Sequence, residues 1–241
     1  MGLPRMTDPD GATPPGSGAM FDGVAPRYDL LNRILSLGLD QSWRRAAIAA
    51  LELTRGALVL DLATGTGDLA LRLARRDPCA RIVGLDPSRR MLERCRQKLA
   101  AATVLEQVDL VLGDARSLPF DDARFDAATM AFGIRNVPDR ARALTELERV
   151  LKPGGRAAIL ELTEPRGRIM GRLARFHMRT LVPRLGALLS SADAYGYLPQ
   201  SIVAFPPPDE FAALIEAAGF ERAKVTPFTF GVCHLFLAVK P

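Results

Sequence analysis

A glycine loop with carboxylates on both sides stands in the segment LVLDLATGTGDL, residues 58–69. Gly65 and Gly67 lack a Cβ and tolerate positive φ, so the backbone N–H groups of the loop can approach a ligand closely. Asp61 and Asp68 place negative charge before and after the glycines. These carboxylates would repel a pyrophosphate at a helix N-terminus and attract a cation. The residue types therefore predict a small-molecule site that favours positive charge.

The spacing of the loop fits two kinds of ligand. It matches a dinucleotide pattern, Gly65-x-Gly67-x-x-Ala70, with Asp86 about 20 residues further on. S-Adenosylmethionine is the other candidate, because it carries a sulfonium, an ammonium and only one carboxylate. The two acids of the loop favour S-adenosylmethionine, and a nicotinamide dinucleotide bound by an oxidoreductase stays the alternative.

Two further acids follow apolar runs that have the character of strands. Asp86 ends one run, where a carboxylate can accept hydrogen bonds from both ribose hydroxyls of a nucleoside. Its alternative role is a helix N-cap, because Pro87 and Ser88 follow and a helix begins there. Asp114 and Ala115 follow the next run and are able to present a carboxylate and a backbone N–H to an adenine edge.

The motif FGIRNVPD continues directly from the fourth apolar run. Arg135 and Asn136 place a cation and an amide at the carboxyl edge of a strand, where ligands bind in open α/β sheets. The alternative is a solvated loop arginine. Neither His177 nor His234 has an acidic ligand cluster near it in the sequence, so no metal site is predicted.

The elements that must position these residues alternate between strands and helices. Continuous apolar runs are typical of strands buried on both faces of a parallel sheet. Their alternation with helices predicts an α/β, Rossmann-like doubly wound sheet that brings several loops to one ligand. Two β-like runs around Gly231 predict a hairpin at the sheet edge. The predicted strands are 58–62, 80–85, 108–112, 125–131, 156–162, 224–230 and 232–239, the helices are 68–75, 88–99, 139–151 and 208–218, and KPGG at 152–155 is a turn.

The remaining N-terminal residues belong to a tail and a cap. Residues 1–18 are rich in Gly, Pro and Thr and predict a disordered tail before a single domain at 19–241. Residues 19–55 predict an N-terminal helical cap, with its second helix at about 41–53. The cap either packs over one sheet edge or walls a ligand cavity. The residues that favour a cavity are Phe21, Tyr28, Asn32 and Trp43.

A substrate-side insertion is expected at 164–205. Ile169, Leu173 and Phe176 stand at helical spacing with arginines between them, which predicts a basic amphipathic helix. Such a helix can lie on a membrane surface, cover the cofactor mouth, pack in a homodimer or face the core. The pattern alone leaves these four uses open.

Composition narrows the class of protein. With 241 residues and 48% hydrophobic content, the chain can bury one full core. The net charge is +5, but aromatic content is 6% and no basic block interleaves with aromatics, so no nucleic acid partner is expected. Three scattered cysteines indicate reduced thiols in a cytoplasmic protein. No apolar run reaches about 18 residues, so we expect no membrane span.

Five motifs carry a resemblance to a known family. The last two in the chain are the most specific, whereas the glycine loop alone indicates only a broad group of methyltransferases. The motifs are RYDLLNRILSLGLDQSWRR at 27–45, LDLATGTGD at 60–68, GDARSLPF at 113–120, FGIRNVPD at 132–139 and YGYLPQSIVAFP at 195–206. With these motifs the chain resembles the quinone-biosynthesis C-methyltransferases of the menaquinone and ubiquinone pathways.

The resemblance implies a class I methyltransferase with a seven-stranded, mostly parallel sheet. Family members often carry Asn where Asp114 stands, and Ser or Gly where Ala131 stands. Asp114 puts a charge where an amide is common, and Ala131 leaves only its backbone to contact a ligand. Together with the loop, the implied S-adenosylmethionine site comprises Asp61, Gly65, Thr66, Gly67, Asp86, Asp114, Ala115 and Ala131.

The same resemblance implies a polyprenylated quinol as the acceptor. An ionised quinol hydroxyl makes the neighbouring ring carbon nucleophilic, so positioning supplies most of the rate. Arg135 and Asn136 are expected to stabilise the phenolate, and Tyr28 is implied in the same cavity. A prenyl tail further implies peripheral contact with the inner face of a membrane. Open alternatives are a naphthoquinol or a benzoquinol, another small phenolic acceptor, and a noncatalytic S-adenosylmethionine-binding subunit.

Overall fold

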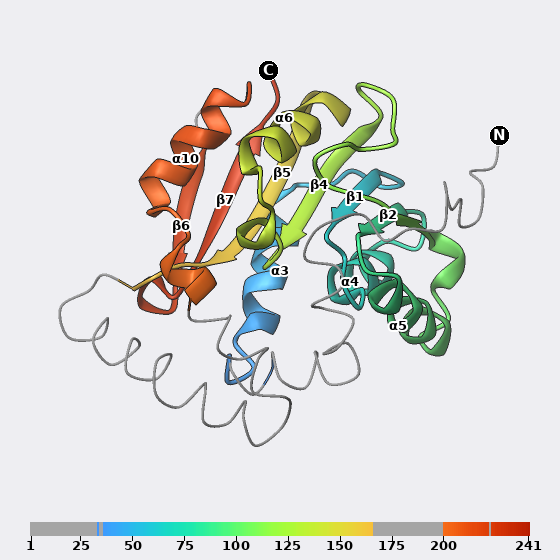
Figure 1. Ribbon diagram of the computed structural model, residues 1–241. Coiled ribbons are helices and arrows are strands. Elements are labelled where there is room, and N and C mark those ends of the chain that lie inside the picture. The colour runs from blue at the N-terminus through green and yellow to red at the C-terminus, as the bar shows by residue number, and fades with distance from the viewer. Residues whose placement is uncertain (1–32, 34–35, 166–199, 222) are drawn as a thin grey trace.

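The computed structural model describes residues 33, 36–165, 200–221 and 223–241 (Figure 1). The predictions for the tail, for Phe21, Tyr28 and Asn32, and for the basic amphipathic stretch of the insertion lie outside these residues. Within the described part, no helix is both long enough and apolar enough to cross a membrane.

Seven strands form one sheet in the order β3-β2-β1-β4-β5-β7-β6. The five strands from β3 to β5 pair in parallel. β7 runs antiparallel to both β5 and β6, so the last two strands form a hairpin at the sheet edge. The predicted fold class is confirmed. The strands are β1 Leu58–Leu62, β2 Arg81–Asp86, β3 Val108–Leu112, β4 Phe125–Ala131, β5 Leu151–Leu162, β6 Lys224–Phe228 and β7 Cys233–Val239.

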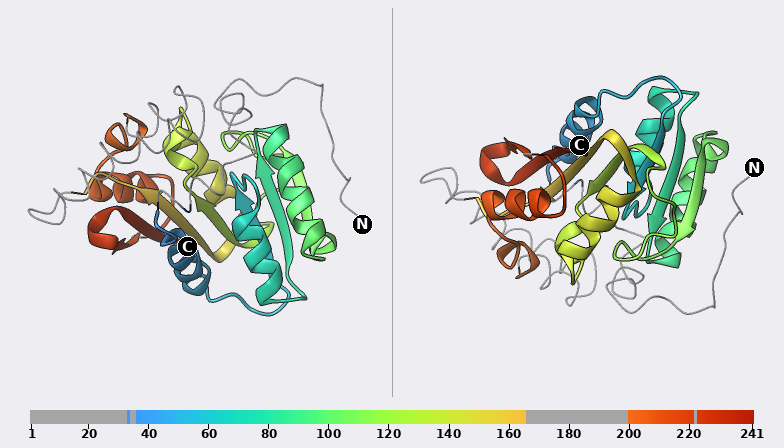
Figure 2. Two further views of the ribbon diagram at one scale, coloured as in Figure 1. Left: turned by 90° about the horizontal axis from the view of Figure 1, so that it is seen from below. Right: turned by 90° about the horizontal axis from the view of Figure 1, so that it is seen from above.

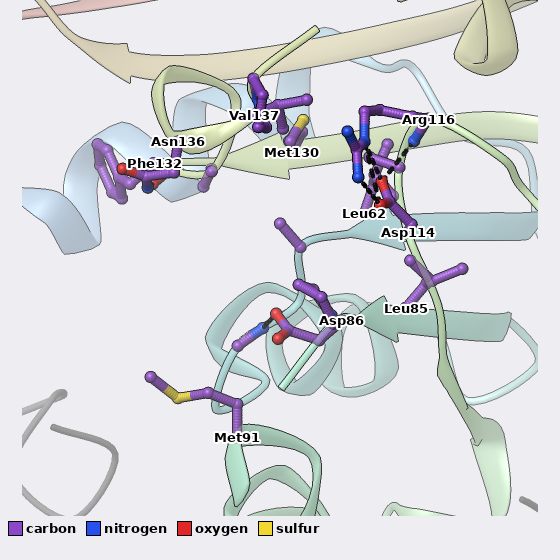
Figure 3. A pocket seen from close by; sticks show the side chains of 17 residues that line it. Leu62, Leu85, Asp86, Met91, Asp114, Arg116, Met130, Phe132, Asn136 and Val137 are labelled. Carbon is purple, nitrogen blue, oxygen red and sulfur yellow. Dashed lines mark hydrogen bonds and ion pairs between the residues drawn. The ribbon is translucent and has the colours of Figure 1, made fainter. Parts of the chain in front are cut away.

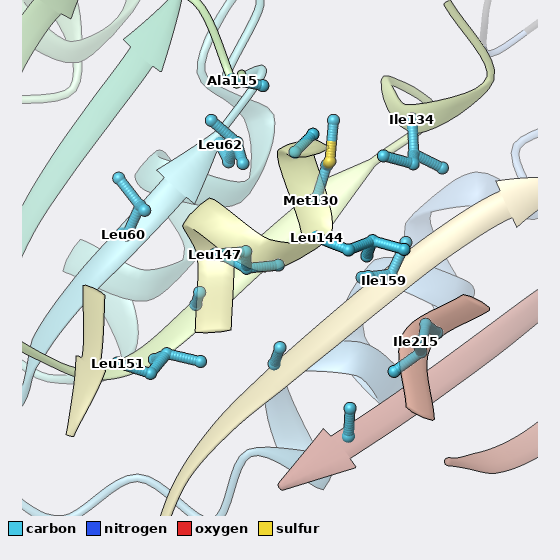
Figure 4. Packing of buried hydrophobic residues seen from close by; sticks show 14 of the residues in the cluster. Leu60, Leu62, Ala115, Met130, Ile134, Leu144, Leu147, Leu151, Ile159 and Ile215 are labelled. Atoms are coloured by element: carbon cyan, nitrogen blue, oxygen red, sulfur yellow. The ribbon is translucent and has the colours of Figure 1, made fainter. Parts of the chain in front are cut away.

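Helices cover both faces of the sheet, as the two end views show (Figure 2). On one face, residues such as Leu73 of α4 and Leu99 of α5 join one hydrophobic cluster. On the other face, Leu144 of α6 and Ile215 of α10 join a second cluster (Figure 4). The helices are α3 Asp40–Ala50, α4 Asp68–Arg76, α5 Arg89–Ala101, α6 Arg140–Val150 and α10 Pro208–Ala217.

The position of β1 in the middle of the sheet, with helices on both faces, explains why its sequence is apolar without alternation. Val59 belongs to the cluster on one face, and its neighbour Leu60 belongs to the cluster on the other. Both side chains are fully buried. Successive side chains of a strand point to opposite faces, so a strand with helices on both sides needs an unbroken apolar run.

The helix α3 covers a face of the sheet, not its edge. It packs against β4, β5, β7 and α4. Its Trp43 is only 4% exposed and belongs to the core. The indole Nε1 donates to the hydroxyl oxygen of Thr229 at 3.2 Å. The edge-cap interpretation of this helix is therefore wrong, and Trp43 stabilises the core instead of lining either cavity described below.

The predicted KPGG turn lies inside β5, which begins five residues earlier than predicted, at Leu151. Leu151 pairs with Phe125, and the next pair is Arg156 with Ala127, so the register shifts between them. Gly154 has a φ of +74°, a conformation that favours glycine. The turn residues therefore bulge from a strand that continues on both sides.

Candidate active site

The candidate site lies at the carboxyl ends of β1, β2 and β4. β1 pairs with β2 on one side and with β4 on the other, so the loops that follow β1 and β4 diverge at this point. Open α/β sheets bind ligands at such a switch point. A cavity opens there, which we call the main cavity (Figure 3). It is lined by Leu62, Ala63, Gly65, Leu85, Asp86, Pro87, Met91, Asp114, Ala115, Arg116, Met130, Ala131, Phe132, Gly133, Asn136, Val137 and Pro138.

The two glycines of the loop have different roles. Gly65 has a φ of +57°, and no atom lies within 4 Å of the position that a Cβ would take. Gly67 has a φ of +84° and precedes α4, but a Cβ there would stand 2.4 Å from the sulfur of Cys95. Burial raises the pKa of the Cys95 thiol to about 12, so this thiol packs as a neutral group. Gly65 thus lines the site, whereas Gly67 permits the contact between the loop and α5.

Replacing Gly67 with alanine should lower the free energy of unfolding by roughly 2–4 kcal/mol, from left-handed backbone strain and overpacking. Gly65→Ala is the matched control, because an alanine there has the same left-handed backbone strain but no clash with a neighbouring side chain. It should lower the free energy of unfolding by about 1–2 kcal/mol. Urea denaturation of both variants measures the difference. Equal losses would show that the Cys95 contact does not restrict position 67.

The carboxylate of Asp86 is held by two backbone N–H groups. Gly65 N donates to Oδ2 at 2.8 Å, and Ser88 N donates to Oδ1 at 2.9 Å. The Ser88 hydroxyl accepts from Met91 N and so caps α5. The N-cap role considered for Asp86 therefore belongs to Ser88. Asp86 lines the main cavity, in a position to receive further donors from a ligand.

Asp114 forms an ion pair with Arg116 at the wall of the main cavity (Figure 3). Arg116 Nη2 stands 2.6 Å from Oδ2, and Nε donates to both carboxylate oxygens. The Arg116 guanidinium holds the pKa of the Asp114 carboxyl below its usual value. The extra charge at this position is thus offset within the chain. Ala115 beside it is buried and also lines the cavity.

Asp61 lies behind the loop, 1% exposed. Its Oδ2 accepts from the Thr64 hydroxyl at 2.6 Å, and its Oδ1 accepts from the Thr129 hydroxyl at 2.7 Å. Burial raises the pKa of this carboxyl, and the two hydroxyls and the charge of Arg44 oppose that rise. Asp61 therefore ties the end of β1 to β4 as well as contributing charge to the site.

A second, smaller cavity lies beside the loop, and we call it the small cavity. It shares Ala63, Gly65 and Ala131 with the main cavity, so the two adjoin. Charged residues make up a larger share of its lining, three of nine against three of seventeen in the main cavity. Its lining is Arg44, Asp61, Ala63, Thr64, Gly65, Thr66, Asp68, Leu69 and Ala131.

Asp68, the other acid of the loop, is offset by two cations. Lys98 Nζ stands 2.8 Å from its Oδ1, and Arg44 Nε stands 4.0 Å from its Oδ2. Burial alone would raise the pKa of Asp68, but Arg44 and Lys98 lower it below the usual value. The argument that Asp68 repels a pyrophosphate is therefore weaker than the sequence suggests. Among the residues that the structure describes, Asp61 has no ion pair.

Arg135 and Asn136 lie on one short turn but face different surroundings. Asn136 lines the main cavity (Figure 3). Arg135 Nη1 donates to Oε1 of Glu161 and to the carbonyl oxygen of Phe132, both at 2.7 Å. The Arg135 and Glu161 side chains are 6% and 0% exposed. The structure thus joins Arg135 to a buried ion pair, and Tyr28, the third predicted residue, lies outside the described residues.

A comparison with known proteins decides the family. The model of the ubiE/COQ5 methyltransferase family matches residues 15–240. The chain belongs to this family. The demethylmenaquinone methyltransferase of Deinococcus radiodurans is 46% identical over 92% of this chain and 91% of its own length. The ubiquinone/menaquinone biosynthesis C-methyltransferase UbiE of Geobacter sulfurreducens is 44% identical over 92% of this chain and 87% of its own length.

Solved structures confirm the fold of this family member. A protein of Methanococcus maripaludis described as an S-adenosylmethionine-dependent methyltransferase superposes with a TM-score of 0.68. The two chains are 18% identical, and the match covers 91% of this chain and 93% of the other. At this identity the likeness supports the fold alone, so the reaction must be argued from the site and the closer relatives.

Three charged residues of the site were not predicted from the sequence of this family member. They are Arg44, Lys98 and Glu161. Each has a partner far along the chain, which is Asp68 for Arg44 and Lys98 and Arg135 for Glu161. Of the three, only Glu161 could have been found from the sequence. It lies near the end of the fifth predicted strand, and the carboxyl ends of parallel strands meet at the edge where ligands bind.

Proposed function

We propose that the chain transfers the methyl group of S-adenosylmethionine to a ring carbon of a polyprenylated quinol, in menaquinone or ubiquinone biosynthesis. The observation that carries this proposal is the pair of adjoining cavities at the switch point of a ubiE/COQ5 family member. One cavity is lined by Asp86 and the Asp114–Arg116 ion pair, and the other by Arg44, Asp61 and Asp68. A nucleoside with a charged tail fits this arrangement, with the nucleoside in the main cavity and the tail in the small cavity. The relatives, which are named as quinone-biosynthesis methyltransferases, supply the acceptor class.

The donor is proposed to lie across both cavities. Asp86 would accept hydrogen bonds from the ribose, while Asp114 and Ala115 would contact the adenine. Thr66 and Ala131 would border the methionyl tail, which passes the open side of Gly65. The bound donor supplies an activated methyl group on a sulfonium. The protein's own task is to bind the donor and the acceptor, to orient them and to exclude water.

The acceptor is proposed to bind beside the turn that carries Arg135 and Asn136. Asn136 would orient the quinol hydroxyl, because its side chain lines the main cavity. Arg135 Nη1 is bound to Glu161 and to the backbone, so Arg135 would stabilise a phenolate through the charge of its guanidinium and not through Nη1. Tyr28 is retained as a proposed third group. The ring carbon beside the ionised hydroxyl then attacks the methyl group in line, the methyl–sulfur bond breaks to release S-adenosylhomocysteine, and the ring carbon loses its proton to restore the aromatic ring.

A thermal-shift test distinguishes a site for S-adenosylmethionine from a site for the alternative dinucleotide. S-Adenosylhomocysteine should raise the midpoint of thermal unfolding, equivalent to about 2.7 kcal/mol when its concentration is about 100 times Kd. NAD at the same concentration should leave the midpoint unchanged. The reverse pattern would favour an oxidoreductase.

The redox state of the acceptor provides a further prediction. Only the hydroquinol can ionise to a phenolate that activates the adjacent carbon, so turnover should require a reductant. Turnover should also rise with pH until the hydroxyl or its helper is deprotonated. Assays with the quinol kept reduced by dithionite, and with the oxidised quinone, measure this. Equal rates with both forms would contradict phenolate activation.

Peripheral membrane contact, a cytoplasmic location and a homodimer remain proposals. The support for membrane contact is the acceptor's apolar tail and the arginine-rich pattern of 168–179 in the sequence. Sedimentation with anionic and with neutral liposomes tests the contact, and binding to neither would contradict it. Equilibrium sedimentation of the free protein tests the dimer.

A further inference from the structure

Arg44 is a buried cation at the small cavity that the proposed mechanism does not yet use. It comes from α3, and its side chain is 8% exposed. The guanidinium carbon lies 5.0 Å from the ring centre of Phe132, a cation–π contact. Arg44 also lines the small cavity together with Thr66 and Asp68. The side chain is thus held rigidly beside the loop that receives the donor.

The acids around Arg44 are already bonded to other donors. Asp40 accepts from the Ser36 hydroxyl at 2.9 Å and from the Gln41 amide at 2.7 Å. Asp68 accepts from Lys98. Arg44 Nε stands 3.5 Å from Asp40 and 4.0 Å from Asp68. Within the described residues this Nε makes no hydrogen bond.

Arg44 thus forms only long ion pairs with Asp40 and Asp68, and a buried guanidinium nitrogen without a hydrogen bond normally has another acceptor. We infer that Arg44 binds the carboxylate of the methionyl tail of the donor. This inference rests on the proposed function and assigns its tail subsite. A carboxylate in the small cavity would meet the planar guanidinium, which suits charge-assisted and bidentate bonds.

The charges of the small cavity fit such a tail. Among the described residues, its lining has one cation, Arg44, and two acids, Asp61 and Asp68, so groups of both signs are present for a zwitterionic tail. The tail brings an ammonium, a carboxylate and the adjacent sulfonium, and so one net positive charge. Arg44 is the cation that lines the cavity. Lys98 is bonded to Asp68 and to the Thr66 hydroxyl, so it supports the loop from α5.

Two nucleosides that differ only in the tail test this assignment by calorimetry. S-Adenosylhomocysteine has the amino acid tail, and 5′-methylthioadenosine lacks it. Arg44→Met keeps an unbranched side chain against Phe132 but removes the charge. It should weaken S-adenosylhomocysteine about 10- to 150-fold, the equivalent of a hydrogen bond to a charged group. It should change the affinity for 5′-methylthioadenosine by less than about threefold.

Arg45→Met is the matched control, because Arg45 is the next residue of α3 and is exposed. It should leave both affinities unchanged. Arg44→Lys keeps the cation without the fork, so it should lose less of the preference for S-adenosylhomocysteine than Arg44→Met does. If the methionine variant fails to fold, the lysine variant still decides through the ratio of its two affinities.

Three results are distinguishable. A selective loss of S-adenosylhomocysteine binding in Arg44→Met supports the assignment. Equal weakening of both nucleosides, or no change in either variant of Arg44, would overturn it and leave Arg44 as a counter-ion of Asp40 and Asp68. Failure of the unaltered protein to bind either nucleoside would instead contradict the proposed function.

Discussion

Replacing Arg135 with alanine is expected to lower the free energy of unfolding by about 3–5 kcal/mol, because it removes one partner of a buried ion pair. Arg135 Nη1 and Glu161 Oε1 are 2.7 Å apart, and the Glu161 side chain is 0% exposed. Two backbone N–H groups, from Arg135 and Leu162, would still donate to Glu161. They bring no full charge, so the carboxylate would stay buried without an ion-pair partner among the described residues. Urea denaturation measures the loss.

Removing the opposite charge provides the control. Glu161→Gln in the Arg135→Ala background eliminates the uncompensated carboxylate and should recover more than half of the loss. A loss below about 1 kcal/mol in Arg135→Ala would instead match an exposed pair and contradict the buried arrangement. No recovery in the double variant would show that the loss comes from packing.

The same substitution bears on the catalytic assignment. Arg135 was predicted to act on the acceptor and not on the donor, so Arg135→Ala should lower kcat while S-adenosylhomocysteine binding stays nearly intact. The structure adds a condition, because the variant must be assayed where it is fully folded. Arg135→Lys retains a cation beside Glu161 and separates loss of the ion pair from loss of the guanidinium.

Replacing Asp86 with alanine should weaken binding of S-adenosylmethionine by about 1.5–3 kcal/mol, because two charge-assisted hydrogen bonds to the ribose would be lost. Asp86 already accepts from Gly65 N, so the substitution also frees the loop. Titration calorimetry of the folded variant measures the affinity. An unchanged affinity would remove Asp86 from the site.

Ser88→Ala is the matched control for Asp86. It removes the cap of α5 and should lower stability by about 0.5–2 kcal/mol. It leaves the Ser88 N–H that donates to Asp86 in place. Donor affinity should therefore stay within about twofold of the unaltered protein. A similar loss of affinity in both variants would mean that the effect comes from the loop geometry, not from ribose contacts.

The sheet could be predicted closely because its strands follow local rules. The bounds of β3 and β4 agree with the predicted 108–112 and 125–131. Each is a short, largely apolar run between turn signals, although β3 is the edge strand and its Asp109 is exposed. The start of β5 could not be predicted, because KPGG is a strong turn signal and only pairing with β4 and β7 continues the strand around it.

The site could be predicted at the level of loops and not of side-chain pairs. Strand ends and glycines locate Asp86, Asn136 and Gly65 beside one cavity. The partner of Arg135, by contrast, lies 26 residues away in the sequence. Nothing in local spacing predicts such a contact. For the same reason the sequence does not indicate that Gly67 packs on Cys95 while Gly65 lines the main cavity.

The proposed function is tested most directly by the destination of a labelled methyl group. S-Adenosylmethionine carrying a ¹³C methyl is incubated with the full chain and reduced polyprenyl naphthoquinol or benzoquinol acceptors that lack the ring methyl, and the products are examined by mass spectrometry and NMR. We predict one labelled methyl on a ring carbon, formed only from the reduced acceptor. Label on a phenolic oxygen, or tight donor binding with no transfer to any quinol, would contradict the proposal.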